Sequence, residues 1–167
     1  MQAIYTGNPY INPGGQAECP RTVTLPIDMV SSRAIIVRRS DGALLGTLHR
    51  ENGRIALPGG LIDDGENPED TILRELDEEN ITLQGSDDDW RSRLSVDYFS
   101  GYRALSLWYI FVVANAEVTK NDETIETKWF QQEEDVWYPN MREKIILAMQ
   151  EHVPDLVKIQ INFLTTM

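Results

Sequence analysis

The stretch from Gly59 to Ile81 constrains the fold of this chain more than any other part of the sequence. Pro58 prevents a helix from starting before it, and Asp64-Gly65 predicts a tight turn. A helix start follows, because Asn67 suits the N-cap and Pro68 suits the first helical position. No glycine or proline follows Pro68 within the stretch. We therefore expect an extended segment, a turning loop and then a helix.

One side of this expected helix is apolar. At about 100° per residue, Ile72, Leu73 and Leu76 fall on the same side, and we expect all three to be buried. Asn80 follows the helical run. Asparagine tolerates the left-handed conformation that ends many helices, so we expect the helix to end there.

A second side of the helix is acidic. Glu75, Glu78 and Glu79 follow i, i+3, i+4 spacing and so share a face. Like charges at this spacing repel by about a few tenths of a kcal/mol per pair. A divalent cation such as Mg²⁺ would offset that repulsion, because it prefers oxygen ligands. Arg74 could hold a carboxylate by paired hydrogen bonds. The alternative interpretation is a solvated acidic face.

The complete pattern is more specific than its parts. The residues at fixed spacing are Gly60, five residues, Glu66, seven residues, Arg74-Glu75-Leu76, one residue, Glu78-Glu79, one residue and Ile81. This pattern resembles the Nudix box, which is glycine, five residues, glutamate, seven residues, Arg-Glu-aliphatic, one residue, Glu-Glu, one residue, glycine and an aliphatic residue. Asn80 stands where the box has its last glycine.

The resemblance implies an enzyme that hydrolyses the pyrophosphate linkage of a nucleoside diphosphate derivative, with Mg²⁺ or Mn²⁺ as cofactor. In this family, Glu78, Glu79 and the Gly59 carbonyl would be metal ligands. Glu75 would be a ligand or the base that activates water. Arg74 would be the orienting group, and Glu66 an auxiliary metal group.

Other site residues are expected outside the box. The family often adds a catalytic glutamate from a later loop, for which Glu123 is the first choice and Glu126 the second. Arg50 and Arg54 precede the glycines and could reach a phosphate, although surface arginines often only pair with nearby acids. Tyr98 is a candidate for stacking on a base.

The substrate favoured by these features is a nucleoside triphosphate or a dinucleoside polyphosphate. Tyr98 lies near the position where dinucleoside polyphosphate hydrolases place a tyrosine. The proline associated with ADP-ribose hydrolases is missing, because no proline occurs between Pro68 and Pro139. Two alternatives belong to other classes: a non-catalytic nucleotide-binding or regulatory module, which a loss of box acids would favour, and a plain acidic interaction domain.

Composition limits the other options. The chain has 167 residues, which suits one domain, and its formal net charge is −12. That charge disfavours non-specific binding to nucleic acid or to an acidic membrane surface. Cys19 is the only cysteine, which fits a cytoplasmic protein, and we see no secretory leader and no membrane span. The expected partner is a small nucleotide-type substrate, and the N-terminal arm or the tail is a candidate homodimer contact.

The remaining segments predict an α/β fold with a mixed sheet covered by helices. The resemblance implies a Nudix-type α/β/α sandwich. We expect an N-terminal arm and edge segment at 1–32, irregular up to residue 20, the main domain at 33–153 and a tail of the same domain at 154–167. Strands are expected at 22–27, 33–39, 43–48, 95–99, 104–113 and 128–131, loops at 84–89 and 114–127, and a second helix at 139–151.

Overall fold

The computed structural model describes residues 2–5, 23–49, 54–86, 91–99, 102–119, 124–134, 137 and 141–158. The first part of the chain holds strands β1 (Gln2–Tyr5), β2 (Val23–Pro26), β3 (Met29–Arg38), β4 (Leu44–His49), β5 (Ile55–Ala56) and β6 (Gly59–Leu61), then helix α1 (Pro68–Glu78). The second part holds β7 (Ile81–Gln84), β8 (Arg91–Phe99), β9 (Tyr102–Val113), β10 (Asn115–Val118), β11 (Thr124–Phe130), helix α2 (Met141–His152) and the 3₁₀ helix η1 (Pro154–Leu156).

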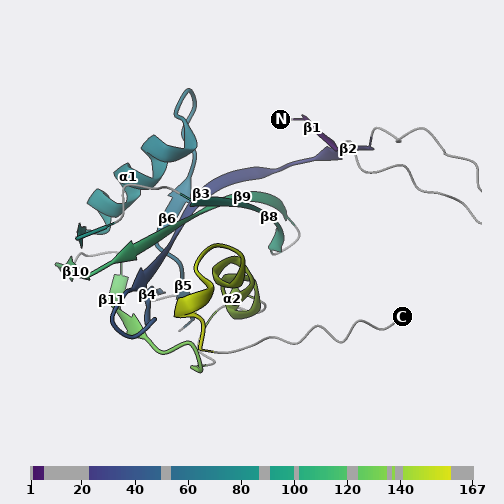
Figure 1. Cartoon of the computed structure of the whole chain (residues 1–167). Coiled ribbons are helices and arrows are strands. Elements are labelled where there is room, and N and C mark those ends of the chain that lie inside the picture. Colours follow the sequence, from purple (N-terminus) through teal and green to yellow (C-terminus); the bar gives the residue numbers. More distant parts are fainter. Residues whose placement is uncertain are drawn as a thin grey trace, which may run out of the picture.

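A central mixed sheet organises these elements. Its main path runs β11-β4-β3-β9-β8, with β5 paired to β4 and β6 paired to β3. The β3–β9 pair is parallel, whereas the other pairs are antiparallel. Helices α1 and α2 lie on opposite sides of the sheet (Figure 1). The expected α/β class and mixed sheet are therefore confirmed.

Strand β3 is apolar along its centre because helices cover both of its faces. Ala34 and Ile36 point into the core beneath α1, where they join Ile72. Ile35 and Val37 alternate with them and point into the core beneath α2. The same alternation holds in β9, as expected for a central strand. This double covering fixes the register of β3, and so fixes where its polar end meets the loop before α1.

Helix α1 begins and ends as the sequence indicates. The Asn67 side chain accepts a hydrogen bond from the Asp70 backbone N–H at 2.9 Å. Asn80 has φ 54°, so it takes the left-handed conformation that follows the helix. The prediction that Leu73 is buried is wrong, because its side chain is 53% exposed. The helix packs through Ile72 and Leu76, which lie one turn apart, and Leu73 is turned away from that contact.

Three strands lie outside the segments that were expected to be extended. Strand β1 lies in the arm, where it pairs with β2. Strands β7 and β10 pair with each other. They lie in segments where the end of the first helix and two loops were expected. Their outer faces carry polar residues, and only one face packs on the core beneath α1. Such short strands have a weak sequence signal, because each depends on a partner some thirty residues away.

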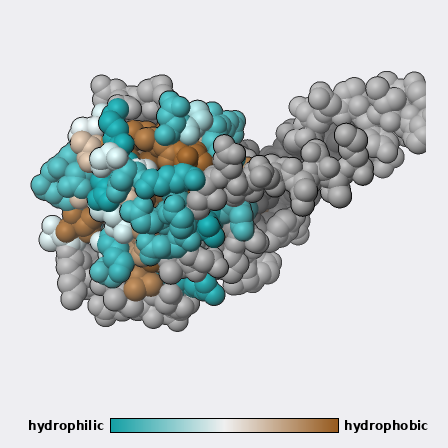
Figure 2. Space-filling view, turned by 60° about the horizontal axis from the view of Figure 1, so that its bottom comes forward, coloured by the Kyte–Doolittle hydropathy of each residue, from teal (hydrophilic) through white to brown (hydrophobic). Residues whose placement is uncertain are grey.

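The boundaries of the other elements agree with expectation within a few residues, except that β3, β8 and β11 begin earlier. Hydrophilic side chains cover most of the coloured surface on the face seen in Figure 2, with smaller hydrophobic areas between them. Among the described residues, no helix is long and apolar enough to cross a membrane. Most of the expected tail, 159–167, lies outside the described residues.

The packing of α1 makes a paired prediction. Replacing the fully buried Ile72 by alanine should lower the free energy of unfolding by about 2–5 kcal/mol, because it leaves a cavity beneath the helix. Replacing its exposed neighbour Leu73 by alanine should change stability by about 0.5 kcal/mol or less. Urea unfolding of both variants measures the difference, and equal losses would contradict the observed orientation of the helix.

Candidate active site

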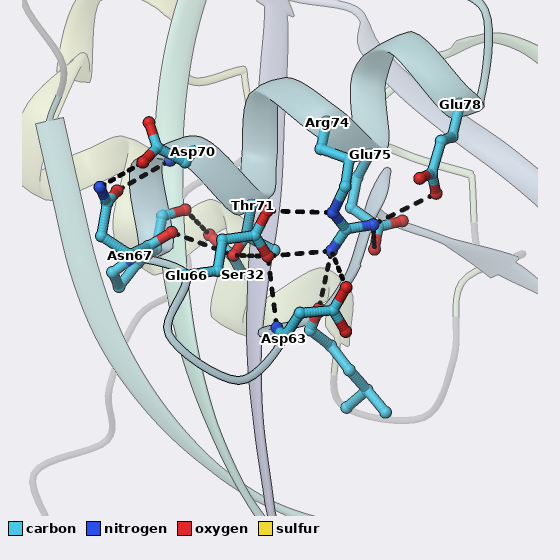
Figure 3. A network of polar contacts seen from close by, with 11 residues as sticks. Ser32, Asp63, Glu66, Asn67, Asp70, Thr71, Arg74, Glu75 and Glu78 are labelled. Carbon is cyan, nitrogen blue, oxygen red and sulfur yellow. Dashed lines mark hydrogen bonds and ion pairs between the residues drawn. The ribbon is translucent and has the colours of Figure 1, made fainter.

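The guanidinium of Arg74 joins helix α1 to the loop before it (Figure 3). Its Nε and Nη2 bond the two carboxylate oxygens of Glu66, at 3.0 and 3.1 Å. Its Nη1 bonds Glu75 at 2.9 Å and Glu78 at 3.2 Å, and its Nη2 also bonds the Leu61 carbonyl at 3.1 Å. A guanidinium has five N–H donors, so these contacts use them all. Arg74 therefore positions carboxylates and has no donor left for another ligand.

Glu66 stabilises the loop before α1 through several hydrogen bonds. Besides the two bonds from Arg74, its carboxylate accepts a bond from the Thr71 hydroxyl at 2.7 Å and from the Asp63 backbone N–H at 3.2 Å. The Arg74 bonds, followed by the Thr71 bond, lower the pKa of Glu66 to about 2. Glu66 is therefore ionised at neutral pH, and these contacts fix the loop against the first turn of the helix.

Two glycines bring the backbone close to these acids. Gly59 has φ +123°, which side chains rarely permit, and a Cβ there would overlap the Ser32 carbonyl oxygen of β3. At Gly60 a Cβ would overlap the carboxylate of Glu75. That carboxylate therefore lies directly against the backbone of Gly60, in space that only glycine leaves open.

Glu79 is the most enclosed of these acids. One carboxylate oxygen accepts from the Gly59 backbone N–H at 3.1 Å, and the other accepts from the Thr47 hydroxyl at 3.3 Å. Thr47 is fully buried on β4, where its hydroxyl also lies 3.1 Å from that of Thr127. Burial raises the pKa of Glu79 to about 7, although the Gly59 bond and the charge of Arg33 oppose the rise.

The acids of helix α1 therefore do not share one environment. Glu79 faces the sheet, Glu75 packs against the loop, and Glu78 has a side chain that is 59% exposed. Within the described ranges, no three acidic, histidine or cysteine side chains lie close enough together to hold a metal ion. The available donors are carboxylate and carbonyl oxygens, which suit a hard divalent cation. They fit such a cation if the exposed Glu78 side chain turns away from Arg74.

The structure describes only some of the other expected site residues. Arg54 is exposed and lies just before β5. Tyr98 belongs to β8, whose side chains are outside the described part, and Arg50 and Glu123 are also outside the described residues. Glu126 is exposed on β11, and its carboxylate lies 2.9 Å from Lys128 Nζ. The structure thus brings the box residues together, and the roles of the box residues and of these other residues stay predictions.

Three contributors were missed by sequence reasoning. Thr71 carries a detectable signal, since it lies in the first turn of the helix and five residues after Glu66. Thr47 and Arg33 carry none, because they reach the site through strand pairing. The guanidinium of Arg33 on β3 donates to the carbonyl oxygens of Gly59 and of Leu57, the latter at 3.3 Å.

Comparisons with known proteins agree with this geometry. The family model described as NUDIX domain matches residues 28–149. A comparison with curated protein sequences gives no match.

Solved structures share the fold. A bifunctional NMN adenylyltransferase/ADP ribose pyrophosphatase from Francisella tularensis matches 76% of this chain at 22% identity, with a TM-score of 0.60. The match covers 41% of the Francisella protein, so this chain spans about two fifths of its length. An Ap4A hydrolase from C. elegans matches 76% of this chain and 98% of its own, at 17% identity and a TM-score of 0.62.

A MutT NUDIX hydrolase from Burkholderia pseudomallei matches 70% of this chain and 95% of its own, at 25% identity and a TM-score of 0.55. The family model covers well over half of the sequence, and the sheet, the helices and the box residues are arranged accordingly. The chain therefore belongs to the Nudix family and has the fold of Nudix hydrolases.

Proposed function

We propose that this protein is a divalent-metal-dependent hydrolase that cleaves the pyrophosphate linkage of a nucleoside diphosphate derivative. One observation carries the proposal. The side chains of Glu75 and Glu79 both lie against the Gly59-Gly60 backbone, one against Gly60 and the other on the Gly59 N–H. A purely solvated acidic face would not enclose a carboxylate or leave glycine-sized space for one.

Four groups of this chain would hold Mg²⁺ or Mn²⁺: the carboxylates of Glu75, Glu78 and Glu79, and the carbonyl of Gly59. A divalent cation bound there would acidify water and stabilise charge on phosphate oxygens. It would also locally invert the negative charge of the protein, which otherwise repels a nucleotide. The Francisella relative has been solved with AMP and a manganese ion, which supports this class of cofactor.

The protein's own residues divide the remaining work. Arg74 holds Glu75 and Glu78 near the loop by hydrogen bonds, and Glu66 keeps Arg74 in place. Thr47 and the Gly59 N–H hold Glu79 in one orientation. Arg50 and Arg54 remain our candidates for contacting substrate phosphates, because both precede the glycine loop in the sequence.

The base that activates water is Glu75 or a later glutamate. Glu126 is the weaker of the two later candidates. Glu126 and Thr127 are neighbours on β11, so their side chains point to opposite faces of the sheet. The Thr127 hydroxyl meets that of Thr47 on the face where Glu79 lies. Glu126 shares its face with Phe130, which packs in the core beneath α2. Glu123 therefore remains our proposed loop glutamate.

The substrate that we favour is a nucleoside triphosphate or a dinucleoside polyphosphate, with Tyr98 as the candidate that stacks on a base. The C. elegans relative is an Ap4A hydrolase, but other relatives with this fold are an ADP-ribose pyrophosphatase and a UDP-X diphosphatase. The fold therefore accommodates several classes of nucleoside diphosphate derivative, and a substrate panel must include all of them.

The competing function is a non-catalytic nucleotide-binding or regulatory module. Such a module needs no enclosed carboxylate beside a glycine backbone. All four glutamates of the box are present, together with the arginine that bonds three of them. Nucleotide binding without phosphate release would favour the module.

The catalytic proposal predicts the effect of removing one carboxylate. With Mg²⁺, the wild-type protein should release phosphate or a nucleotide from one class in a panel of nucleoside triphosphates, dinucleoside polyphosphates, ADP-ribose and nucleotide sugars. Glu79→Gln should lower kcat by about a hundredfold or more, because it removes an ionised oxygen from the proposed metal site.

Glu143→Gln is the matched control, because it changes an exposed glutamate near the start of α2, the helix on the opposite side of the sheet. It should leave kcat unchanged. Near-normal turnover in a folded Glu79→Gln protein would contradict the assignment. No turnover of any substrate with either Mg²⁺ or Mn²⁺ would count against the enzyme and in favour of the module.

The enclosure of Glu79 also predicts a pH dependence of stability. Its pKa is about 7 in the folded protein, against an ordinary value of 4.5. Between these values the folded state binds more protons than the unfolded state, so the free energy of unfolding falls as pH rises from about 4.5 to about 7. This loss persists above pH 7 in the metal-free protein.

Glu79→Gln cannot ionise, so the variant should not show this loss. With EDTA present, its stability relative to wild type should increase by about 1–3 kcal/mol between pH 4.5 and pH 8. Urea unfolding at the two pH values measures the change, with Glu143→Gln again as control. A difference between Glu79→Gln and wild type that stays constant with pH would show that Glu79 does not titrate in this range.

A further inference from the structure

Arg33 is an arginine whose side chain reaches the backbone of the glycine loop. It lies on β3 directly opposite Gly59 in the antiparallel register with β6. Its Nη1 donates to the Gly59 carbonyl oxygen and, at 3.3 Å, to the Leu57 carbonyl oxygen. The side chain is only partly exposed, so the guanidinium is held within the structure rather than lying free on the surface.

Hydrogen bonds with two side chains therefore hold both backbone polar groups of Gly59. Its N–H donates to Glu79, and its carbonyl accepts from Arg33. The residue has φ +123°, a conformation that glycine adopts readily and other residues rarely do. Side chains of opposite charge, one directly after α1 and one from β3, therefore fix the two peptide planes next to Gly59.

This arrangement matters for the direction of the Gly59 carbonyl. A carbonyl oxygen has two lone pairs, so a bond from Arg33 occupies one and leaves the other for a second partner. The bond to the Leu57 carbonyl anchors the guanidinium to the strand end before the loop, so the donor does not move independently of its acceptor.

We propose that Arg33 is a positioning residue for the metal site, which aims the Gly59 carbonyl at the cation that Glu79 also binds. The inference rests on the metal-binding part of the proposed function. It assigns Arg33 no contact with substrate. The residue acts through Gly59.

Two effects of Arg33 on a cation oppose each other. Its positive charge repels a divalent cation, whereas its hydrogen bonds pre-organise a ligand. Residues that orient metal ligands typically change metal affinity by about ten- to a hundredfold. The proposal states that orientation dominates, so removing Arg33 must weaken metal binding rather than strengthen it.

The test is Mn²⁺ binding, measured by electron paramagnetic resonance of the free ion in titrations of the full chain. Arg33→Met keeps the apolar stem and removes the donors and the charge. Its Kd for Mn²⁺ should rise about tenfold. Arg33→Lys keeps a charged donor and should lose about threefold, as partial rescue.

Arg38→Met is the matched control. Arg38 is at the other end of β3, where it forms a two-bond pair with Asp41 at 2.7 and 2.8 Å. Its loss should lower stability without changing Mn²⁺ binding. A purely structural role for Arg33 would produce this same pattern, so unchanged or tighter Mn²⁺ binding by folded Arg33→Met would overturn the proposal. If Arg33→Met does not fold, wild-type affinity in Arg33→Lys overturns it.

The outcome for Arg33 is separable from the outcome for the enzyme. If the wild type binds Mn²⁺ but hydrolyses nothing in the substrate panel, the catalytic proposal fails while the affinity series still tests Arg33. If the wild type hydrolyses a substrate and Arg33→Met binds Mn²⁺ normally, only the inference about Arg33 fails. A wild type that binds no Mn²⁺ would overturn both.

Discussion

The bonds of Arg74 hold this site together. Without its guanidinium, Glu66, Glu75 and Glu78 would repel one another at the junction of loop and helix. With it, carboxylates from both elements share one fixed cation at distances of 2.9–3.2 Å. The bidentate bonds to Glu66 matter most, because they tie the helix back to the loop that carries the glycines. In a chain with a net charge of −12, this internal cation lets an acidic site form without a bound ion.

The sheet supplies the other half of the site. Strand β6 pairs with the polar end of β3, which brings Gly59 beside Arg33, and β4 adds the buried hydroxyl of Thr47. Glu79 closes over this surface from the helix. Burial makes its charged form costly, so its environment is suited to a state in which a further cation is near. The fold therefore places the enclosed carboxylate of Glu79 next to the backbone of Gly59, whose carbonyl accepts a hydrogen bond from Arg33.

Local signals were sufficient to predict the helix and most of the residues around it. Asn67 and Pro68 marked its start and Asn80 its end, and the spacing of the glutamates predicted a metal site. The helical wheel was less successful, since it placed Leu73 with the buried residues. A wheel locates an apolar stripe but not its centre, which here is set by Ile72 and Leu76 against the sheet.

The parts that could not be predicted depend on pairing between distant segments. Strands β7 and β10 have polar outer faces and become recognisable only as partners. Arg33 and Gly59 are 26 residues apart, and no local pattern connects them until β3 and β6 are in register. The same holds for Thr47, whose role is visible only when Glu79, directly after α1, is hydrogen-bonded to it. Sequence therefore identified the acids of the site, and the structure identified what orients them.

The most direct test of this account is a crystal structure of the protein grown with Mn²⁺, using the anomalous signal of the metal to locate it. The account predicts one strong peak at ligand distance, about 2 Å, from both the Gly59 carbonyl oxygen and a carboxylate oxygen of Glu79. Glu78 should have turned from Arg74 toward the ion, while the Arg74–Glu66 pair remains intact. A peak bound elsewhere, or no peak at this site with Mn²⁺ at saturating concentration, would contradict the account.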